Sequence, residues 1–281
     1  MKMKQFRRLC CLLGCIVCFL GGCAKHHKEE PVENAEVKVT FFDVGKGDAV
    51  LIETKAHRML IDTGYDDTYP LIRDYLEEQH IEMLDYLVIT HFDKDHVGGA
   101  DRLLKDFAVE NILQPDYDSD ANQYLEYCDI VDKKGLQPVC VTETMKFALD
   151  ETEFLIYPPQ KESYKEEDND FSLVISMDCK AQSFLFAGDC EEVRLEELLE
   201  QEEFDLSHNV LKVPHHGKRE DNSKEFLEAV APDIAIITCS EEEEPSEKIC
   251  EQLEKLKAEI YLTSEGTVTC LCDGSRVQVI Q

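Results

Sequence analysis

The segment Thr90–Gly99, THFDKDHVGG, directly follows the apolar run LDYLVIT. Such a run is typical of a strand that is covered on both faces. Four ionisable side chains lie within the next six residues: His91, Asp93, Asp95 and His96. Carboxylates this close repel one another unless a cation neutralises them. The segment therefore predicts a metal site at the end of a buried strand, with a solvated acidic loop as the alternative.

Two later segments favour the metal site over the acidic loop. FLFAGDC ends an apolar run with Asp189, and LKVPHHG ends another with His215 and His216. Each pattern alone is typical of a turn or of a hydrogen-bonded histidine pair. Three strand ends that deliver histidine and aspartate to one rim predict a shared site, in which Asp189 bridges two ions and one of the two histidines completes the second.

The pattern of strands and helices predicts a single α/β domain over residues 37–281. Short apolar runs bounded by turn residues alternate with segments of helical spacing from Val37 onward. The last two runs flank Asp273-Gly274, which is a strong hairpin signal. Two stacked sheets with helices outside would cover the apolar faces, so we expect a four-layer αββα sandwich.

The charge balance limits the class of partner. The 281 residues include 60 acidic and 29 basic side chains, and the formal net charge is −31. Such a surface repels polyanions at long range, which disfavours a general nucleic-acid-binding surface. A local collar of positive side chains in the rim loops could still bind phosphate, although each of them could equally be ordinary surface. These candidate substrate-binding residues are Lys46, Lys94, Lys218 and Arg219.

The N-terminus predicts export and a lipid anchor. The basic segment MKMKQFRR is followed by an apolar stretch that is too short to span a bilayer, and then by LGGC. This order predicts a lipoprotein signal peptide over residues 1–22, a lipidated Cys23 and a flexible tether over 23–36, with an uncleaved anchor as the alternative. The protein would then face outward from a bacterial cell membrane. The domain cysteines could be buried thiols or disulfides.

Six motifs together resemble the metallo-β-lactamase superfamily, and most closely its ComEC-type branch, the hydrolase domain of bacterial DNA-uptake proteins. The resemblance spans almost the whole domain, and it implies the metallo-β-lactamase form of the αββα sandwich and a metal-dependent hydrolase. The motifs, in chain order, are FFDVGKGDAVLIET, RMLIDTG, THFDKDHVGG, NDFSLVI, FLFAGD and LKVPHHG.

The resemblance also implies roles for individual residues. His91 and Asp93 would bind one metal ion, Asp95 and His96 the other, and Asp189 would bridge them. His215 would be the last ligand, with His216 as the second choice, because the register is open by one residue. Asp62 would orient a ligand from behind.

One ligand that many superfamily members have is missing here. No histidine lies between His96 and His208. Asn169, Asp170 or water would take its place, so one of the two divalent sites would be weak. The aspartate at position 93 admits manganese as well as zinc.

These features predict an exported phosphodiesterase in which a hydroxide that bridges two metal ions attacks phosphorus. The expected catalytic residues are Asp95 and His216, the latter as a proton donor to the leaving group. DNA and a cell-envelope polymer are the candidate substrates, the membrane is contacted through the lipid, and no obligate protein partner is indicated. The alternatives are a non-catalytic binding lipoprotein on the same fold and a hydrolase of another ester or amide, with β-lactams ranked low.

Overall fold

The computed structural model describes residues 32, 34–164, 167–201 and 204–281. The predictions for the signal peptide over 1–22, for the lipidated Cys23 and for most of the tether therefore lie outside the described residues. Residues 32–281 form one compact unit. Within the described residues, no helix is both long and apolar enough to cross a membrane.

The first sheet has eight strands in the order β15-β14-β1-β2-β3-β4-β5-β6. Its strands are antiparallel from β15 to β3 and parallel from β3 to β6. The strands are β1 Val37–Phe41, β2 Val50–Glu53, β3 Arg58–Ile61, β4 Met83–Val88, β5 Ala108–Gln114, β6 Val139–Cys140, β14 Val268–Cys272 and β15 Val277–Ile280.

The second sheet has seven strands in the order β13-β12-β11-β10-β9-β8-β7. Its strands are parallel from β13 to β10 and antiparallel from β10 to β7. The strands are β7 Met145–Leu149, β8 Thr152–Tyr157, β9 Val174–Cys179, β10 Gln182–Phe186, β11 Val210–Lys212, β12 Ile234–Ile237 and β13 Glu259–Leu262.

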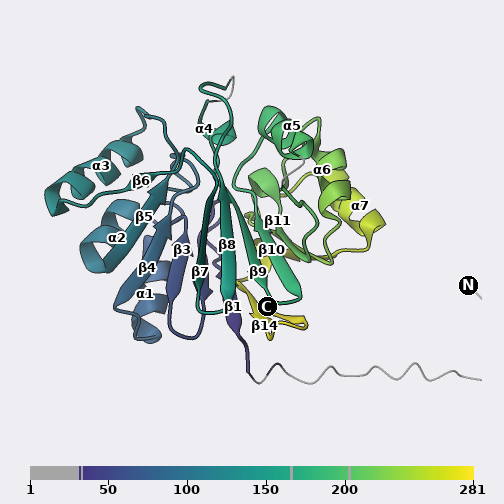
Figure 1. Cartoon of the computed structure of the whole chain (residues 1–281), viewed down its shortest axis with the longest axis horizontal. Coiled ribbons are helices and arrows are strands. Elements are labelled where there is room, and N and C mark those ends of the chain that lie inside the picture. The colour runs from purple at the N-terminus through teal and green to yellow at the C-terminus, as the bar shows by residue number, and fades with distance from the viewer. Residues whose placement is uncertain (1–31, 33, 165–166, 202–203) are drawn as a thin grey trace, which may run out of the picture. The chain divides into compact units, whose positions relative to one another are not determined.

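Helices cover the outer face of each sheet, so the domain has four layers (Figure 1). One apolar core lies between the sheets, a second lies under α1–α3, and a third lies under α5–α7. The αββα prediction is therefore confirmed. The helices are α1 Tyr69–Glu78, α2 Ala100–Asp106, α3 Asn122–Lys134, α4 Glu167–Asp170, α5 Glu192–Glu200, α6 Ser223–Val230 and α7 Glu247–Leu256, with 3₁₀ turns η1 Pro214–Gly217 and η2 Thr263–Glu265.

Strand β4 shows why its sequence is almost continuously apolar. Leu87 packs in the core under α1–α3, whereas its neighbour Val88 packs in the core between the sheets. Both faces are covered at the end of the strand, so Leu87 and Val88 are both apolar, whereas Asp85 lies in the less buried first half. The strand ends at Val88, and the first predicted metal ligand, His91, follows three residues later.

The strand that leads to His215 and His216 ends before the two histidines. Strand β11 ends at Lys212, and residues 214–217 form the turn η1. Pro214 has no backbone N–H for the sheet, and His215 and His216 both adopt left-handed backbone angles, with φ of 48° and 52°. The chain therefore turns at the point where the histidines begin.

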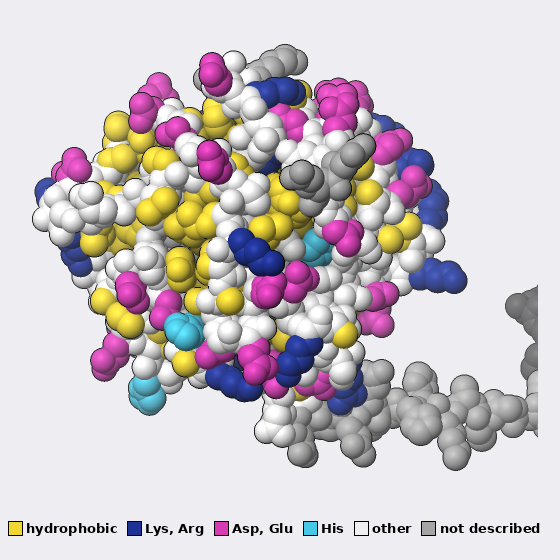
Figure 2. Space-filling model, viewed as in Figure 1, with side chains coloured by type: hydrophobic (Ala, Val, Ile, Leu, Met, Phe, Trp, Pro, Cys, Tyr) yellow, Lys and Arg dark blue, Asp and Glu magenta, His cyan; other side chains and the backbone are white. Residues whose placement is uncertain are grey.

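The structure also shows how the surface charges are distributed and in which state the cysteines are. Acidic side chains are scattered over the face in Figure 2, with lysines and arginines among them. The eight cysteines of the described residues are all free thiols, five of them buried. Buried thiols and disulfides were the two alternatives for the domain cysteines, and the structure has free thiols.

Candidate metal centre

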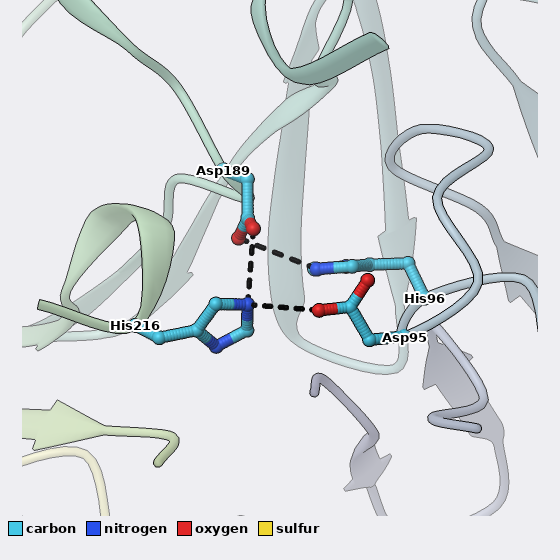
Figure 3. Close-up of side chains that lie close together, drawn as sticks. All are labelled: Asp95, His96, Asp189 and His216. Atoms are coloured by element: carbon cyan, nitrogen blue, oxygen red, sulfur yellow. Dashed lines mark ion pairs between the residues drawn. The ribbon is translucent and has the colours of Figure 1, made fainter. Parts of the chain in front are cut away.

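Loops that follow three different strands bring two histidines and two aspartates together (Figure 3). The Nε2 atom of His216 lies 2.9 Å from Oδ2 of Asp189 and 3.6 Å from Oδ2 of Asp95. The Nε2 atom of His96 lies 3.3 Å from Oδ1 of Asp189. All four side chains are buried, and one donor atom from each lies within 4.8 Å of the others. The four atoms thus surround a space of the size that one cation needs.

Three ring nitrogens at this centre have no hydrogen-bond partner among the described residues. They are the buried Nε2 atoms of His91, His96 and His216. Buried polar atoms without partners are rare in folded proteins and call for an explanation such as an ion. The donor set of imidazole nitrogens and carboxylate oxygens suits divalent metals such as zinc and manganese. The residues present therefore fit divalent cations.

The opposite nitrogen of each ring is held in place. Nδ1 of His96 lies 2.8 Å from Asp62 Oδ2, and Nδ1 of His216 lies 2.9 Å from the carbonyl oxygen of Thr238. A partner at Nδ1 fixes the ring and leaves the lone pair of Nε2 free to bind a metal ion. Asp62 thus lies where the sequence placed it, behind a candidate ligand.

The His91 side of the centre is more open. His91 Nε2 lies 3.9 Å from Asp93 Oδ2, and 37% of the Asp93 side chain is exposed. Burial and the nearby Asp168 carboxylate raise the pKa of Asp93 to about 6. Burial lowers the pKa of His91 well below its usual value, so this ring is neutral. This pair offers fewer donor atoms than the His96 side.

Opposite charges dominate the buried side of the centre. Burial lowers the pKa of His96, but the Asp189, Asp62 and Asp48 carboxylates outweigh it and raise that pKa well above its usual value. Burial raises the pKa of Asp189, but His216, His96 and Lys212 outweigh it and lower that pKa well below its usual value. The carboxylate of Asp189 is therefore ionised and available to a cation.

Sequence reasoning missed a lysine and an aspartate beneath the centre. The Lys212 side chain is 1% exposed, and its Nζ lies 2.5 Å from Asp48 Oδ2 and 3.4 Å from Asp189 Oδ1. Asp48 also accepts a hydrogen bond of 2.6 Å from Thr238 Oγ1. A lysine within the apolar run VLKV, residues 210–213, is the sequence signal for this ion pair, because a buried charge needs a partner.

The structure places His216 at the centre, although His215 was the first choice as the last ligand and His216 the second. His216 reaches Asp189, whereas Nδ1 of His215 lies 3.2 Å from Glu191 Oε1 and 3.5 Å from Glu220 Oε1. The left-handed turn at these two residues sends their side chains to different places. Backbone strain of this kind costs of order 1–3 kcal/mol per residue and is concentrated at functional sites.

Neither candidate replacement for the missing histidine lies at the centre. Asp170 Oδ1 accepts hydrogen bonds from the backbone N–H groups of Glu191 (2.9 Å) and Arg194 (3.3 Å), at the start of α5. Asn169 Nδ2 donates to the Glu191 side chain at 3.0 Å. Both side chains therefore organise the start of α5, and neither belongs to the clusters of candidate ligands in the described part of the chain, so the replacement of the histidine by one of them or by water stays a prediction.

The four candidate phosphate-binding residues differ in position. Lys46 Nζ lies 3.3 Å from Asp95 Oδ2, against the centre itself. Lys94 is exposed, with its Nζ 6.0 Å from the centre of the Tyr65 ring. Lys218 pairs with glutamates beside His215, and Arg219 is exposed without an ion pair among the described residues. Only Lys46 directly contacts a residue of the centre.

Comparisons with known proteins agree with this geometry. Residues 42–240 match the family model described as the metallo-beta-lactamase superfamily. The chain is 25% identical over 261 residues to ComE operon protein 3 of Bacillus subtilis (strain 168), covering 85% of this chain and 33% of that protein. It is 28% identical over 227 residues to competence protein ComA of Neisseria gonorrhoeae, covering 79% of this chain and 30% of that protein. The chain thus spans about a third of the length of these relatives.

Solved structures resemble the fold at low sequence identity. The CmlA beta-hydroxylase E377D mutant superposes with a TM-score of 0.57 at 14% identity, over 86% of this chain and 55% of that one. The metallo-beta-lactamase fold protein YhfI from Bacillus subtilis gives a TM-score of 0.53 at 10% identity, over 81% of this chain and 96% of that one. These similarities support the fold.

Proposed function

This chain belongs to the metallo-β-lactamase superfamily, and we propose that it is a metal-dependent phosphodiesterase whose buried histidines and aspartates bind the metal ions. The observation that carries the proposal is the convergence of three unpartnered imidazole nitrogens, from His91, His96 and His216, around the ionised carboxylate of Asp189. Buried polar atoms without hydrogen bonds call for an explanation such as a bound ion, so they support a metal-dependent protein over one that binds no metal.

Two groups of side chains would hold two divalent cations. Asp95, His96 and His216 would bind one together with Asp189, while His91 and Asp93 would bind the other and share Asp189 with it. When bound, such cations polarise phosphoryl oxygens and activate water for an in-line displacement. The second group has fewer ligands and an exposed member, so we propose that it is the weaker site.

The chain's own residues would bind and orient the phosphodiester. Lys46 lies against Asp95 and is half-buried, so its ammonium group is placed to neutralise a phosphoryl oxygen. Asp62 and Thr238 hold the rings of His96 and His216 in fixed orientations. His216, His96 and Lys212 together outweigh burial and keep the Asp189 carboxylate ionised, because they lower its pKa.

Two substrate classes remain candidates within this proposal. The similarity to proteins named for competence supports DNA. The net charge of −31 opposes a long polyanion, and the predicted lipid attachment at Cys23 would keep the domain at the cell envelope. A short or surface-attached phosphodiester of the envelope is therefore the second candidate. Export and anchoring would be tested by mass spectrometry of the mature N-terminus, which should be a diacylglyceryl-modified Cys23.

The activity itself is tested with bis(p-nitrophenyl) phosphate. We expect turnover that requires added manganese or zinc and is abolished by Asp189→Asn, while the surface variant Asp178→Asn retains it. Labelled single-stranded DNA and wall polymers would then be compared as substrates. No turnover by protein that binds metal would refute the phosphodiesterase, and failure to bind metal would refute the enzyme altogether.

A further inference from the structure

A second cluster of potential ligands lies beside the centre and has no role in the proposed reaction. It consists of Glu191, His215 and Glu220, and a donor atom from each lies within 4.8 Å of the others. Glu191 precedes α5, His215 lies in the turn η1, and Glu220 lies in the loop before α6. The cluster therefore joins three segments that are separate in the sequence.

Two atoms of this cluster lack hydrogen bonds. The His215 side chain is 6% exposed, and its buried Nδ1, which points at the two carboxylates, makes no hydrogen bond among the described residues. Buried Oε1 of Glu220 accepts none either. An imidazole nitrogen and a carboxylate oxygen that face each other and make no hydrogen bond are the same signature that marks the main centre.

The spacing of the donor atoms fits a metal ion. A tetrahedral site with bonds of about 2.1 Å separates its ligand atoms by about 3.4 Å. His215 Nδ1 lies 3.2 Å from Glu191 Oε1 and 3.5 Å from Glu220 Oε1. The corresponding distances in the main centre run from 2.9 to 3.6 Å. We propose that Glu191, His215 and Glu220 bind an additional divalent cation, separate from the ions of the main centre.

Lys218 is the competitor for this position. Its Nζ lies 3.3 Å from Glu191 Oε1 and 3.7 Å from Glu220 Oε1. Its side chain is 60% exposed, so it can turn into solvent when a cation arrives. The lysine leaves His215 Nδ1 unsatisfied, because an ammonium group has donors and no acceptor to offer. A metal ion satisfies the nitrogen and both carboxylates together.

The additional ion would stiffen the segments that carry the main centre. Glu191 follows the bridging residue Asp189 by two positions, and His215 precedes His216 directly. Backbone N–H of His215 already donates to the carbonyl oxygen of Gly188 at 3.1 Å. An ion on Glu191 and His215 would therefore hold the segments after β10 and β11 together, whatever reaction the main centre performs.

The test measures manganese binding by the whole purified chain after equilibrium dialysis. We expect Glu220→Gln and His215→Asn each to lose one equivalent of Mn²⁺, whereas Glu244→Gln, in an exposed loop, loses none. Asp189→Asn should disturb the main centre and keep this equivalent, and Asp189→Asn combined with Glu220→Gln should lose it. Lys218→Met should raise the affinity at this site several-fold, because it removes the competing cation.

Two outcomes would overturn the proposal. One is a Glu220→Gln protein with a native circular dichroism spectrum that binds as many ions as the wild type. The other is a Lys218→Met protein whose manganese affinity is equal or lower, which would make the lysine the built-in cation of the cluster. The phosphodiesterase proposal fails separately, through the Asp189→Asn assay, so the two results are distinguishable.

Discussion

His208 precedes β11 in the chain and His216 follows it. Both are buried, with 5% and 4% of their surface exposed, yet their rings have different surroundings. His208 is satisfied at both nitrogens, by Ser176 Oγ at 2.7 Å and by the Leu206 carbonyl oxygen at 3.0 Å. His216 has a hydrogen-bond partner at Nδ1, whereas its Nε2 makes no hydrogen bond and lies 2.9 Å from Asp189 Oδ2. A buried histidine with two partners supports the fold, whereas one with a free nitrogen supports a ligand. The predictions below test this distinction.

The largest effect is expected from the buried charge beneath the centre. Lys212→Met removes the cation that lies between Asp48 and Asp189, and leaves two buried carboxylates without it. Breaking a buried ion pair in this way costs about 3–5 kcal/mol. Urea unfolding of the metal-free protein should show this loss. The exposed Lys248→Met should stay within about 0.5 kcal/mol of the wild type, and a Lys212→Met loss of that size would contradict the account.

Metal binding should distinguish the roles of His208 and His216 directly. At a free Mn²⁺ concentration of 100 times Kd, one site raises the free energy of unfolding by about 2.7 kcal/mol. His208→Gln should retain this gain in full, because both of its ring nitrogens have partners within the protein. His216→Ala should lose the gain from one site. Thermal unfolding with manganese and with a chelator measures both, and a full gain in His216→Ala would remove His216 from the ligands.

The orientation of His96 gives the next smaller effect. Asp62→Asn replaces the carboxylate that holds Nδ1 of His96 by an amide of the same shape. Loss of such a partner behind a ligand lowers metal affinity by about 10- to 100-fold. Competition with a fluorescent chelator should detect the change, and the exposed Asp178→Asn is the matched control. Equal affinities in the two variants would mean that Asp62 has no influence on the metal.

Much of the centre could be predicted from sequence, because its ligands follow strands that are recognisable by their apolar runs. THFDKDHVGG places histidines and aspartates directly after such a run, FLFAGD places an aspartate there, and both segments contribute to the centre. A local pattern of this kind depends only on neighbours in the chain. The αββα layers could be predicted for the same reason, since each strand and helix has its own periodicity.

The remainder depends on contacts between distant segments and on backbone angles. Asp48 meets Lys212 only because the loop between β1 and β2 lies at the same rim as the end of β11. The choice between His215 and His216 depends on left-handed backbone angles at both residues. Neither residue is a glycine, so the sequence does not indicate these angles. Asp170 is a candidate replacement for the missing histidine, but one of its oxygens accepts backbone hydrogen bonds at the start of α5. Residue type alone does not distinguish these uses of a carboxylate.

The smallest expected effect is the pH dependence that comes from His208. Burial lowers the pKa of His208 below its usual value, so the folded state binds fewer protons than the unfolded chain, whose histidines titrate near about 6.5. The stability from the neutral ring is therefore complete above that pH and is lost as the pH falls through it towards the folded-state pKa. The wild type should lose more stability than His208→Gln between pH 7.5 and pH 5 in urea unfolding with a chelator present. Because the other titrating groups are common to both proteins, the difference isolates this ring. An equal loss in the two proteins would show that His208 accepts a proton without cost, and would weaken its assignment as a histidine that serves only the fold.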